Sequence, residues 1–143
     1  MIHAIKQLSD PFIHVINDDP VRPEIPAEHR VGPNREVLVS LEQNKPTAAV
    51  CVCYQNFVPT STVELNSSDD HSVAVFYTIW SYSPGAGKKL VFLARDYILE
   101  NRKSVKRFVT LSPPTEMARK FHIQNGAFEL QVNNDTVNYE YML

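Results

Sequence analysis

The sequence is poor in several residues that mark particular classes of protein. It has two cysteines, four glycines and one tryptophan in 143 residues, and its formal net charge is -2. So few cysteines exclude a disulfide-rich scaffold, and the small net charge gives no general attraction to nucleic acid or to an anionic membrane. With a hydrophobic share of 43%, residues 1–143 are expected to fold as one domain around a sizeable core.

The chain also lacks long apolar runs. None approaches the ~20 residues of a membrane span, and the start MIHAIKQLSD has neither the cationic end nor the apolar segment of a signal peptide. We therefore expect a cytoplasmic protein with no membrane contact. Cys51 and Cys53 lie two residues apart on a predicted strand, and no further Cys or His pair follows at ligand spacing. We expect reduced core thiols and no metal.

Hydrophobic periodicity and turn residues predict an α/β chain of the mixed α+β kind. Apolar residues recur at i, i+3, i+4 and i+7 from Lys88, which predicts a helix ending near residues 101–103. Ser112 and Pro113 are typical of a second helix start, with Gly126 closing that helix, and a short helix is expected after Pro11. Strands are predicted at residues 1–6, 35–41, 47–55, 72–82, 106–111, 128–132 and 137–141, with loops at 17–34 and 56–71 and a short extended piece at 62–65.

Two of the four glycines lie in the turn SPGAGKK between the strand at 72–82 and the helix that follows it. A P-loop would need Gly at the position of Tyr82 and Ser or Thr at that of Lys89, and a dinucleotide fingerprint would need Gly at Leu90. Two interpretations stay open: a tight turn without a ligand, or an anion site at a helix N-terminus. Lysines in the first turn of a helix oppose its dipole, and a bound anion would reverse that penalty.

This turn and a later segment, ARKFHIQNGA at residues 118–127, together resemble motifs of the GNAT-fold N-acetyltransferase superfamily. Gly85 and Gly87 match the glycines of its acetyl-CoA pyrophosphate loop, Q/R-x-x-G-x-G/A, whose first position is Tyr82 here. In the later motif, A-x-x-[LF]-Y-x-x-x-G-F, His122 replaces the tyrosine and Ala127 the phenylalanine. The resemblance covers residues 35–141 in element order, with motif support between residues 76 and 126.

The resemblance implies a central mixed, mostly antiparallel sheet flanked by helices, with a V-shaped splay between two central parallel strands. It implies acetyl-CoA as cosubstrate, direct attack by an amine, and His122 or Ser112 assisting the departing thiolate, since a histidine can donate a proton near neutral pH. A solvent-facing His122 without a catalytic role is the alternative. The implied cofactor-binding residues are Ile79, Trp80, Ser81, Tyr82, Gly85, Ala86, Gly87, Lys88 and Lys89.

No Glu or Asp lies on the strand at 73–81, so the general base of such a reaction has to be sought elsewhere. Glu64, Asp69, Asp70 and His71 are loop candidates, with a solvated polar loop as the alternative. Three functions stay open: transfer of an acetyl group to a small-molecule or peptide amine, a binding or structural module that has lost catalysis, and a nucleic-acid base-modifying enzyme. For the third, the support is the cluster Arg102, Lys103, Lys106 and Arg107, which could instead contact the adenosine phosphate or form a solvated rim.

Two further points complete the expectations. The acceptor is not named by any pattern in the loops at 17–34 and 56–71, which should carry specificity. A homodimer formed through the last hairpin, at 137–141, is one further arrangement that the sequence permits.

Overall fold

The computed structural model describes residues 1–142 as one seven-stranded sheet with the order β1-β2-β3-β4-β5-β7-β6. The elements are β1 (Ile2–Ile5), η1 (Ile13–Asp18), η2 (Ala27–His29), β2 (Arg35–Glu42), β3 (Lys45–Gln55), η3 (Thr62–Glu64), β4 (Val73–Ser81), α1 (Ala86–Asn101), β5 (Arg107–Thr110), α2 (Glu116–Gln124), β6 (Phe128–Val132) and β7 (Val137–Tyr141). All neighbouring strands pair antiparallel except β4 and β5, which are parallel because α1 carries the chain back across the sheet. The predicted fold class is confirmed.

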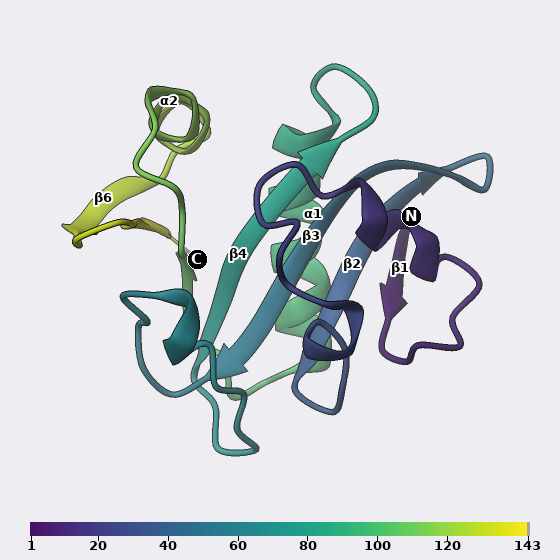
Figure 1. Ribbon diagram of the computed structural model, residues 1–143, viewed down its shortest axis with the longest axis horizontal. Coiled ribbons are helices and arrows are strands. Elements are labelled where there is room, and N and C mark those ends of the chain that lie inside the picture. Colours follow the sequence, from purple (N-terminus) through teal and green to yellow (C-terminus); the bar gives the residue numbers. More distant parts are fainter. Residues whose placement is uncertain (143) are drawn as a thin grey trace.

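Two hydrophobic cores cover the two faces of the sheet. On one face α1 buries Leu90, Ala94 and Ile98 against β2, β3 and β4, as its helical period predicts. On the other face the N-terminal segment, with η1 and η2, packs against side chains that include both cysteine thiols. Figure 1 shows α1 behind the central strands and the N-terminal loops in front of them. Because β4 is covered on both sides, its sequence is apolar on both faces.

Several predicted boundaries are wrong. The β2–β3 turn is only Gln43 and Asn44, both with positive φ (52° and 63°), so the strands run further than Pro46 suggested. The expected extended piece at 62–65 is a 3-10 turn, η3. The short helix after Pro11 is the 3-10 helix η1, which begins at Ile13.

The position of the C-terminal hairpin in the sheet limits how the predicted homodimer could form. β7 lies between β5 and β6 and pairs with both, so its backbone is not free to pair with a second copy, and the outer strand is β6. The dimer through residues 137–141 stays a prediction, and pairing of strands between two copies would have to use β6, the outer strand of this hairpin. Within residues 1–142, no helix is long and apolar enough to cross a membrane.

Candidate functional site

A β-bulge in β4 opens the centre of the sheet. Cys51 of β3 pairs with Thr78, but its neighbour Val52 pairs with Phe76, which leaves Tyr77 as an extra residue on β4. The parallel pairing of β4 with β5 ends at the same place, with Phe76 opposite Thr110. Beyond this point the two strands separate, so a cavity can form between the second half of β4 and the residues that follow β5.

An arginine from the N-terminal loop fixes this separation from the face opposite α1. The Arg22 guanidinium donates from Nε to the Tyr77 carbonyl (2.9 Å) and from Nη2 to the Leu111 carbonyl (3.0 Å), one on each diverging strand. Both carbonyls have lost a strand partner to the splay, and the guanidinium replaces it. Arg22 thereby bridges the two strands at the base of the cavity.

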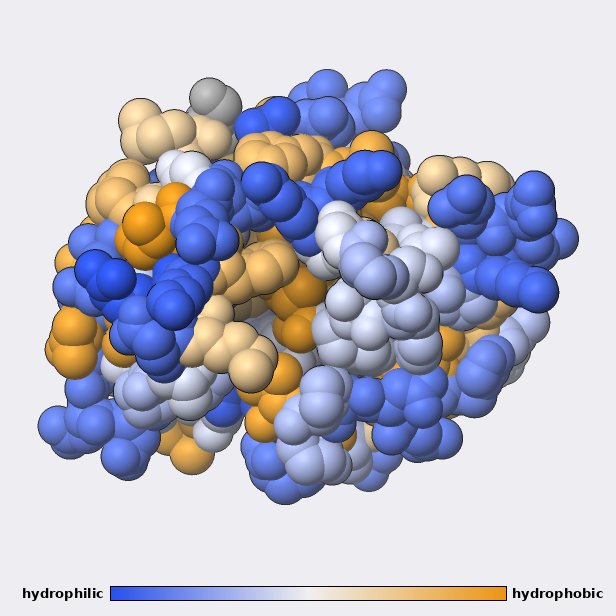
Figure 2. Space-filling model, turned by 90° about the horizontal axis from the view of Figure 1, so that it is seen from above, coloured by the Kyte–Doolittle hydropathy of each residue, from blue (hydrophilic) through white to orange (hydrophobic). Residues whose placement is uncertain are grey.

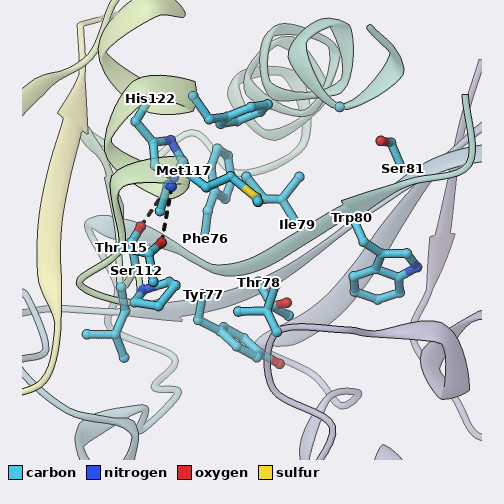
Figure 3. Close-up of a pocket in the computed structure, with 16 residues that line it drawn as sticks. Phe76, Tyr77, Thr78, Ile79, Trp80, Ser81, Ser112, Thr115, Met117 and His122 are labelled. Atoms are coloured by element: carbon cyan, nitrogen blue, oxygen red, sulfur yellow. Dashed lines mark hydrogen bonds between the residues drawn. The ribbon is translucent and has the colours of Figure 1, made fainter. Parts of the chain in front are cut away.

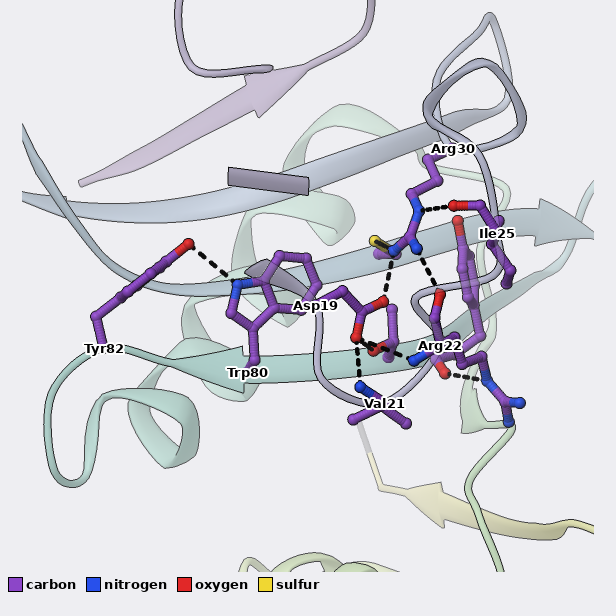
Figure 4. A network of polar contacts seen from close by, with 10 residues as sticks. Asp19, Val21, Arg22, Ile25, Arg30, Trp80 and Tyr82 are labelled. Atoms are coloured by element: carbon purple, nitrogen blue, oxygen red, sulfur yellow. Dashed lines mark hydrogen bonds and ion pairs between the residues drawn. The ribbon is translucent and has the colours of Figure 1, made fainter. Parts of the chain in front are cut away.

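The loop that carries Arg22 is itself held by a buried carboxylate, Asp19 (Figure 4). Asp19 accepts hydrogen bonds from the backbone N–H groups of Val21 (2.8 Å) and Arg22 (3.1 Å) and from the Thr78 hydroxyl (2.8 Å). It also pairs with the buried Arg30 guanidinium at 2.6 Å. The sequence reasoning missed this network, since Asp19 and Arg30 lie in a proline-rich stretch that resembles an ordinary loop.

Ser112 and His122 meet at the end of the cavity that lies next to α2. Ser112 Oγ lies 3.2 Å from His122 Nε2, and both residues are buried, with exposed fractions of 4% and 5% (Figure 3). The other ring nitrogen, Nδ1, lies 2.7 Å from the Tyr141 hydroxyl, and the ring stacks on Tyr139 with centroids 5.1 Å apart. The solvent-facing alternative for His122 is therefore wrong.

The position of Ser112 corrects another prediction. Ser112 does not begin a helix: its backbone N–H and C=O both pair with Val137, at 2.9 Å each, and α2 starts four residues later. Thr115 caps α2 instead, accepting from the Ala118 N–H at 3.2 Å. Because Ser112 is held by strand-like pairing, its hydroxyl is free to face the helix that carries His122.

Burial determines the charge of the pair. Desolvation lowers the pKa of His122 to about 4, so its imidazole is neutral at pH 7. Burial likewise raises the pKa of Tyr141 to about 12, which keeps the phenol protonated. A proton donated by His122 near pH 7 would therefore come from the neutral imidazole N–H, because burial disfavours the imidazolium in the free protein.

The cavity has a volume of about 280 Å³ and is lined mostly by apolar side chains. Figure 2 views the molecule from the side where α2 and the β4–α1 turn lie, with apolar side chains at the centre of the face and hydrophilic ones around them. The lining residues are Val21, Phe76, Tyr77, Thr78, Ile79, Trp80, Ser81, Gly87, Leu111, Ser112, Pro113, Thr115, Met117, Ala118, Phe121 and His122. None of these sixteen is Asp, Glu, Lys or Arg, so the wall carries no fixed charge.

The glycine turn borders this cavity. Gly85 has φ of 79°, and α1 begins at the next residue. The Ala86 N–H donates to Ser83 and the Lys89 N–H to Gly85, which leaves the N–H groups of Gly87 and Lys88 for an anion at the helix N-terminus. Gly87 lies close to Phe121 of α2: a Cβ atom added at Gly87 would be 3.6 Å from the Phe121 ring.

The structure divides the predicted cofactor-binding residues into three groups. Ile79, Trp80, Ser81 and Gly87 line the cavity, while Gly85, Ala86, Lys88 and Lys89 form the helix start beside it. Tyr82 has another role: its hydroxyl donates to Asp18 (2.7 Å) and accepts from the Trp80 indole N–H (3.2 Å), so it fixes Trp80 against the N-terminal loop.

The loop candidates for a general base lie outside the cavity. The Glu64 carboxylate accepts from Thr60, the Asp69 carboxylate from Asn34, and His71 contacts the Ser68 carbonyl. None of these three, nor Asp70, lines the cavity wall. They are parts of a polar loop, as the alternative stated.

In the basic cluster near the end of α1, Arg102 and Arg107 contact other side chains, whereas Lys103 and Lys106 are exposed. Arg102 lies over the Tyr54 ring (3.8 Å) and near Glu36 (3.7 Å), and Arg107 forms a bidentate pair with Glu140 at 2.8 Å. The cluster lies at the C-terminal end of α1, whose 16 residues separate it from the glycine turn by ~24 Å. The nucleic-acid function stays a prediction, supported only by the two exposed lysines, Lys103 and Lys106. Within residues 1–142, no group of three or more His, Cys, Asp or Glu side chains is placed to hold a metal ion.

Comparisons with known proteins give matches at the level of structure. The chain resembles a malonyl-CoA decarboxylase from Agrobacterium vitis (TM-score 0.79, 17% identity, 100% of this chain, 60% of that one). It also resembles the GNAT domain of S. lividans PAT (0.68, 11%, 99% and 89%) and a GNAT family acetyltransferase from Elizabethkingia anophelis solved with acetyl-CoA bound (0.63, 12%, 100% and 97%). The chain has the GNAT fold.

This GNAT-fold chain matches no protein-family description and no curated protein sequence. It spans about 60% of the length of the A. vitis malonyl-CoA decarboxylase and 89–97% of the two acetyltransferase chains. With identities of 11–17% in these three structures, the likeness establishes the fold. The chemistry has to be argued from the site.

Proposed function

We propose that this protein binds an acyl-CoA and decarboxylates a malonyl-type thioester, a thioester whose acyl group ends in a free carboxylate. The observation that carries the proposal is the buried Ser112–His122 pair at the end of a cavity whose lining has no charged side chain. The reaction needs a proton donor and an apolar environment around the substrate carboxylate. It does not need a carboxylate base.

The residues around the cavity fit coenzyme A. The pyrophosphate would lie at the start of α1, where the N–H groups of Gly87 and Lys88 are free and two exposed lysines add positive charge. The pantetheine arm would follow β4 past Ser81 and Ile79 into the splay, which brings the thioester toward Ser112. Coenzyme A supplies the thioester, whose carbonyl can accept the electron pair that decarboxylation releases.

The reaction balances with a single proton. The bond between Cα and the carboxylate carbon breaks, CO₂ leaves, and the electron pair moves into the thioester as an enolate. A proton then forms the new C–H bond at Cα, delivered from the Ser112 hydroxyl and His122 and replaced from water. An apolar wall favours loss of the carboxylate, since a desolvated anion is destabilised relative to neutral CO₂.

The fold comparison supports this choice in part. Three malonyl-CoA decarboxylases superpose with TM-scores of 0.76 to 0.79, against 0.63 to 0.68 for the GNAT and acetyltransferase structures. This chain corresponds to 56–60% of each decarboxylase, so activity of this part alone is a proposal.

The second candidate is acetyl transfer from acetyl-CoA to a small-molecule or peptide amine. One observation favours it: the chain spans 89–99% of the GNAT and acetyltransferase structures that it resembles. His122 lines the cavity and could take the proton of the amine, but a pKa of about 4 makes it a weak base. An α-amine, with a pKa of ~8, would be an easier acceptor than lysine at ~10.4.

The test offers the protein malonyl-CoA and acetyl-CoA in separate reactions, each with and without a panel of amines. We expect CO₂ and acetyl-CoA from malonyl-CoA without an amine, and a loss of at least ~100-fold in kcat for Ser112→Ala and His122→Phe. Release of free CoA from acetyl-CoA only when an amine is present would favour the second candidate.

Binding is measured separately by calorimetry with acetyl-CoA and with the Gly87→Glu variant. The added side chain would push a negative charge toward the pyrophosphate and against Phe121, so we expect binding to be lost while the fold stays intact. Binding without turnover of either thioester would indicate a module that has lost catalysis. Absence of binding to the unmodified protein would contradict the proposed cofactor site.

A further inference from the structure

A chain of four side chains runs through the Ser112–His122 pair. From one end to the other, the Tyr141 hydroxyl lies 2.7 Å from His122 Nδ1, His122 Nε2 lies 3.2 Å from Ser112 Oγ, and Ser112 Oγ lies 2.8 Å from Thr110 Oγ1. All four side chains are buried, with exposed fractions of 5% or less. Tyr141 and Thr110 do not line the cavity, so the hydrogens of the two outer contacts have to be placed within the chain itself.

The hydrogen count of each group restricts the arrangement. A neutral imidazole has one N–H and one acceptor nitrogen, and a hydroxyl has one hydrogen to donate. If Tyr141 donates to Nδ1, the imidazole hydrogen must be on Nε2 and point at Ser112 Oγ. Ser112 then directs its own hydrogen to Thr110, the direction that the geometry of that contact gives.

The alternative is the reverse order, with Ser112 donating to Nε2 and Nδ1–H donating to Tyr141. A phenol is a much stronger acid than a neutral imidazole N–H, and an imidazole nitrogen is the better base, so the O–H···N direction is favoured at Tyr141. At the other end, Thr110 Oγ1 also accepts the Tyr139 backbone N–H at 3.0 Å, which holds the threonine hydroxyl in place as an acceptor.

We infer that Tyr141 and Thr110 are positioning residues that fix the protons of the site, so that His122 carries its hydrogen on Nε2 and Ser112 is a hydrogen-bond donor. A nucleophilic serine requires the opposite arrangement, in which the base nitrogen accepts the serine hydrogen. The Ser112 hydroxyl can instead rotate from Thr110 to an acyl group in the cavity, with His122 Nε2–H behind it. Ser112 therefore donates to the substrate and forms no acyl-enzyme.

The proton positions can be read without any substrate. The protein is labelled with ¹⁵N in its five histidine rings, and long-range ¹H–¹⁵N correlation at pH 7 distinguishes the two tautomers, with His122→Phe identifying the His122 signals. We expect the Nε2–H tautomer. The Nδ1–H tautomer, or an imidazolium, would overturn the inference.

Two variants test which residues set the tautomer. Tyr141→Phe removes the donor to Nδ1 and is expected to shift His122 to a mixture, while the matched control Tyr139→Phe, which keeps the ring stacked on His122, leaves the tautomer unchanged. Thr110→Val frees the Ser112 hydrogen and is expected to shift His122 toward Nδ1–H, which covers the case that Tyr141→Phe fails to fold. Unchanged His122 signals in Thr110→Val would contradict the inference.

The catalytic consequence rests on the proposed function and is measured apart from the tautomer. With malonyl-CoA, Thr110→Val should lower kcat about tenfold, the effect of one lost hydrogen bond, and Thr110→Ser should restore it to within about twofold. Trapping of a covalent acyl-enzyme on Ser112 would contradict the donor role. If malonyl-CoA is not turned over at all, the proposed function fails and the tautomer result still stands.

Discussion

His122 illustrates how one residue derives its properties from its surroundings. Histidines are often exposed on short helices such as α2, which has nine residues. Here the ring of His122 contacts the rings of Tyr139 and Phe121, and its two nitrogens face two hydroxyl groups. These contacts satisfy both ring nitrogens in the neutral state. The same burial that suits His122 to a relay of neutral hydrogen bonds makes its protonation costly.

Acid should therefore destabilise the protein through His122. Its pKa is about 4 in the folded state and ~6.5 when unfolded, so the unfolded state binds more protons between these values. The stability that depends on neutral His122 is fully present above about pH 6.5 and is lost as the pH falls toward 4, by up to ~3 kcal/mol. Urea denaturation of the wild type and of His122→Gln should show a steeper loss in the wild type between pH 6.5 and 4. Parallel curves would contradict the assignment of this loss to His122.

At the scale of elements, the contact between the N-terminal loop and the splayed strands holds the site together. Where β4 and the residues after β5 separate, their backbone carbonyls no longer pair with each other. The loop at 17–34 provides Arg22, which donates to two of these carbonyls, and Asp19, which accepts from the Thr78 hydroxyl. The loop therefore completes the hydrogen bonding of the sheet at the bulge. We expect it to contribute more to stability than its irregular backbone suggests.

Asp19 and its neighbour Asp18 provide a matched test of this idea. Asp19→Ala leaves Arg30 buried without its partner and removes three further hydrogen bonds, so the free energy of unfolding should fall by ~3–5 kcal/mol. Asp18→Ala removes one exposed contact, to Tyr82, and should cost ~1 kcal/mol or less. Chemical denaturation measures both. Equal costs would mean that the buried network does not hold the loop.

The whole molecule has two cores that share one sheet. Leu38, Val50 and Ala74 face α1, while Val39, Cys51 and Val75 on the same strands face the N-terminal segment. Loss of either core would expose one whole face of these strands and remove half of the packing that holds the sheet. The two faces should therefore unfold together.

Trp80 makes this expectation measurable. It is the single tryptophan, and it packs on the face opposite α1, so its fluorescence reports that face while far-UV circular dichroism reports the helices and the sheet. We expect the two urea transitions to coincide in midpoint and slope. An earlier transition of the fluorescence would show that the N-terminal segment detaches while the sheet persists.

The sequence by itself determined the order of the elements. The period of 3.6 after Lys88, the doubly apolar strand at 72–82 and the glycine at 126 each act within a few residues, through packing faces and backbone conformations that local sequence encodes. For the same reason the turn at Gly85 could be placed beside a helix N-terminus. His122 could be named from its position in the motif at residues 118–127 and Ser112 from the chemistry that the resemblance implies, although Ser112 was given the wrong local structure.

Tertiary structure alone decided the chemistry of the site. The bulge at Tyr77 depends on the register with β3, and Arg22 binds carbonyls that lie 55 and 89 positions further along the chain. The partner of His122 Nδ1 comes from the last strand. No local pattern encodes such contacts, because they arise only when distant segments are packed side by side. The pKa of His122 follows the same rule, since desolvation is a property of the folded environment and not of the residue.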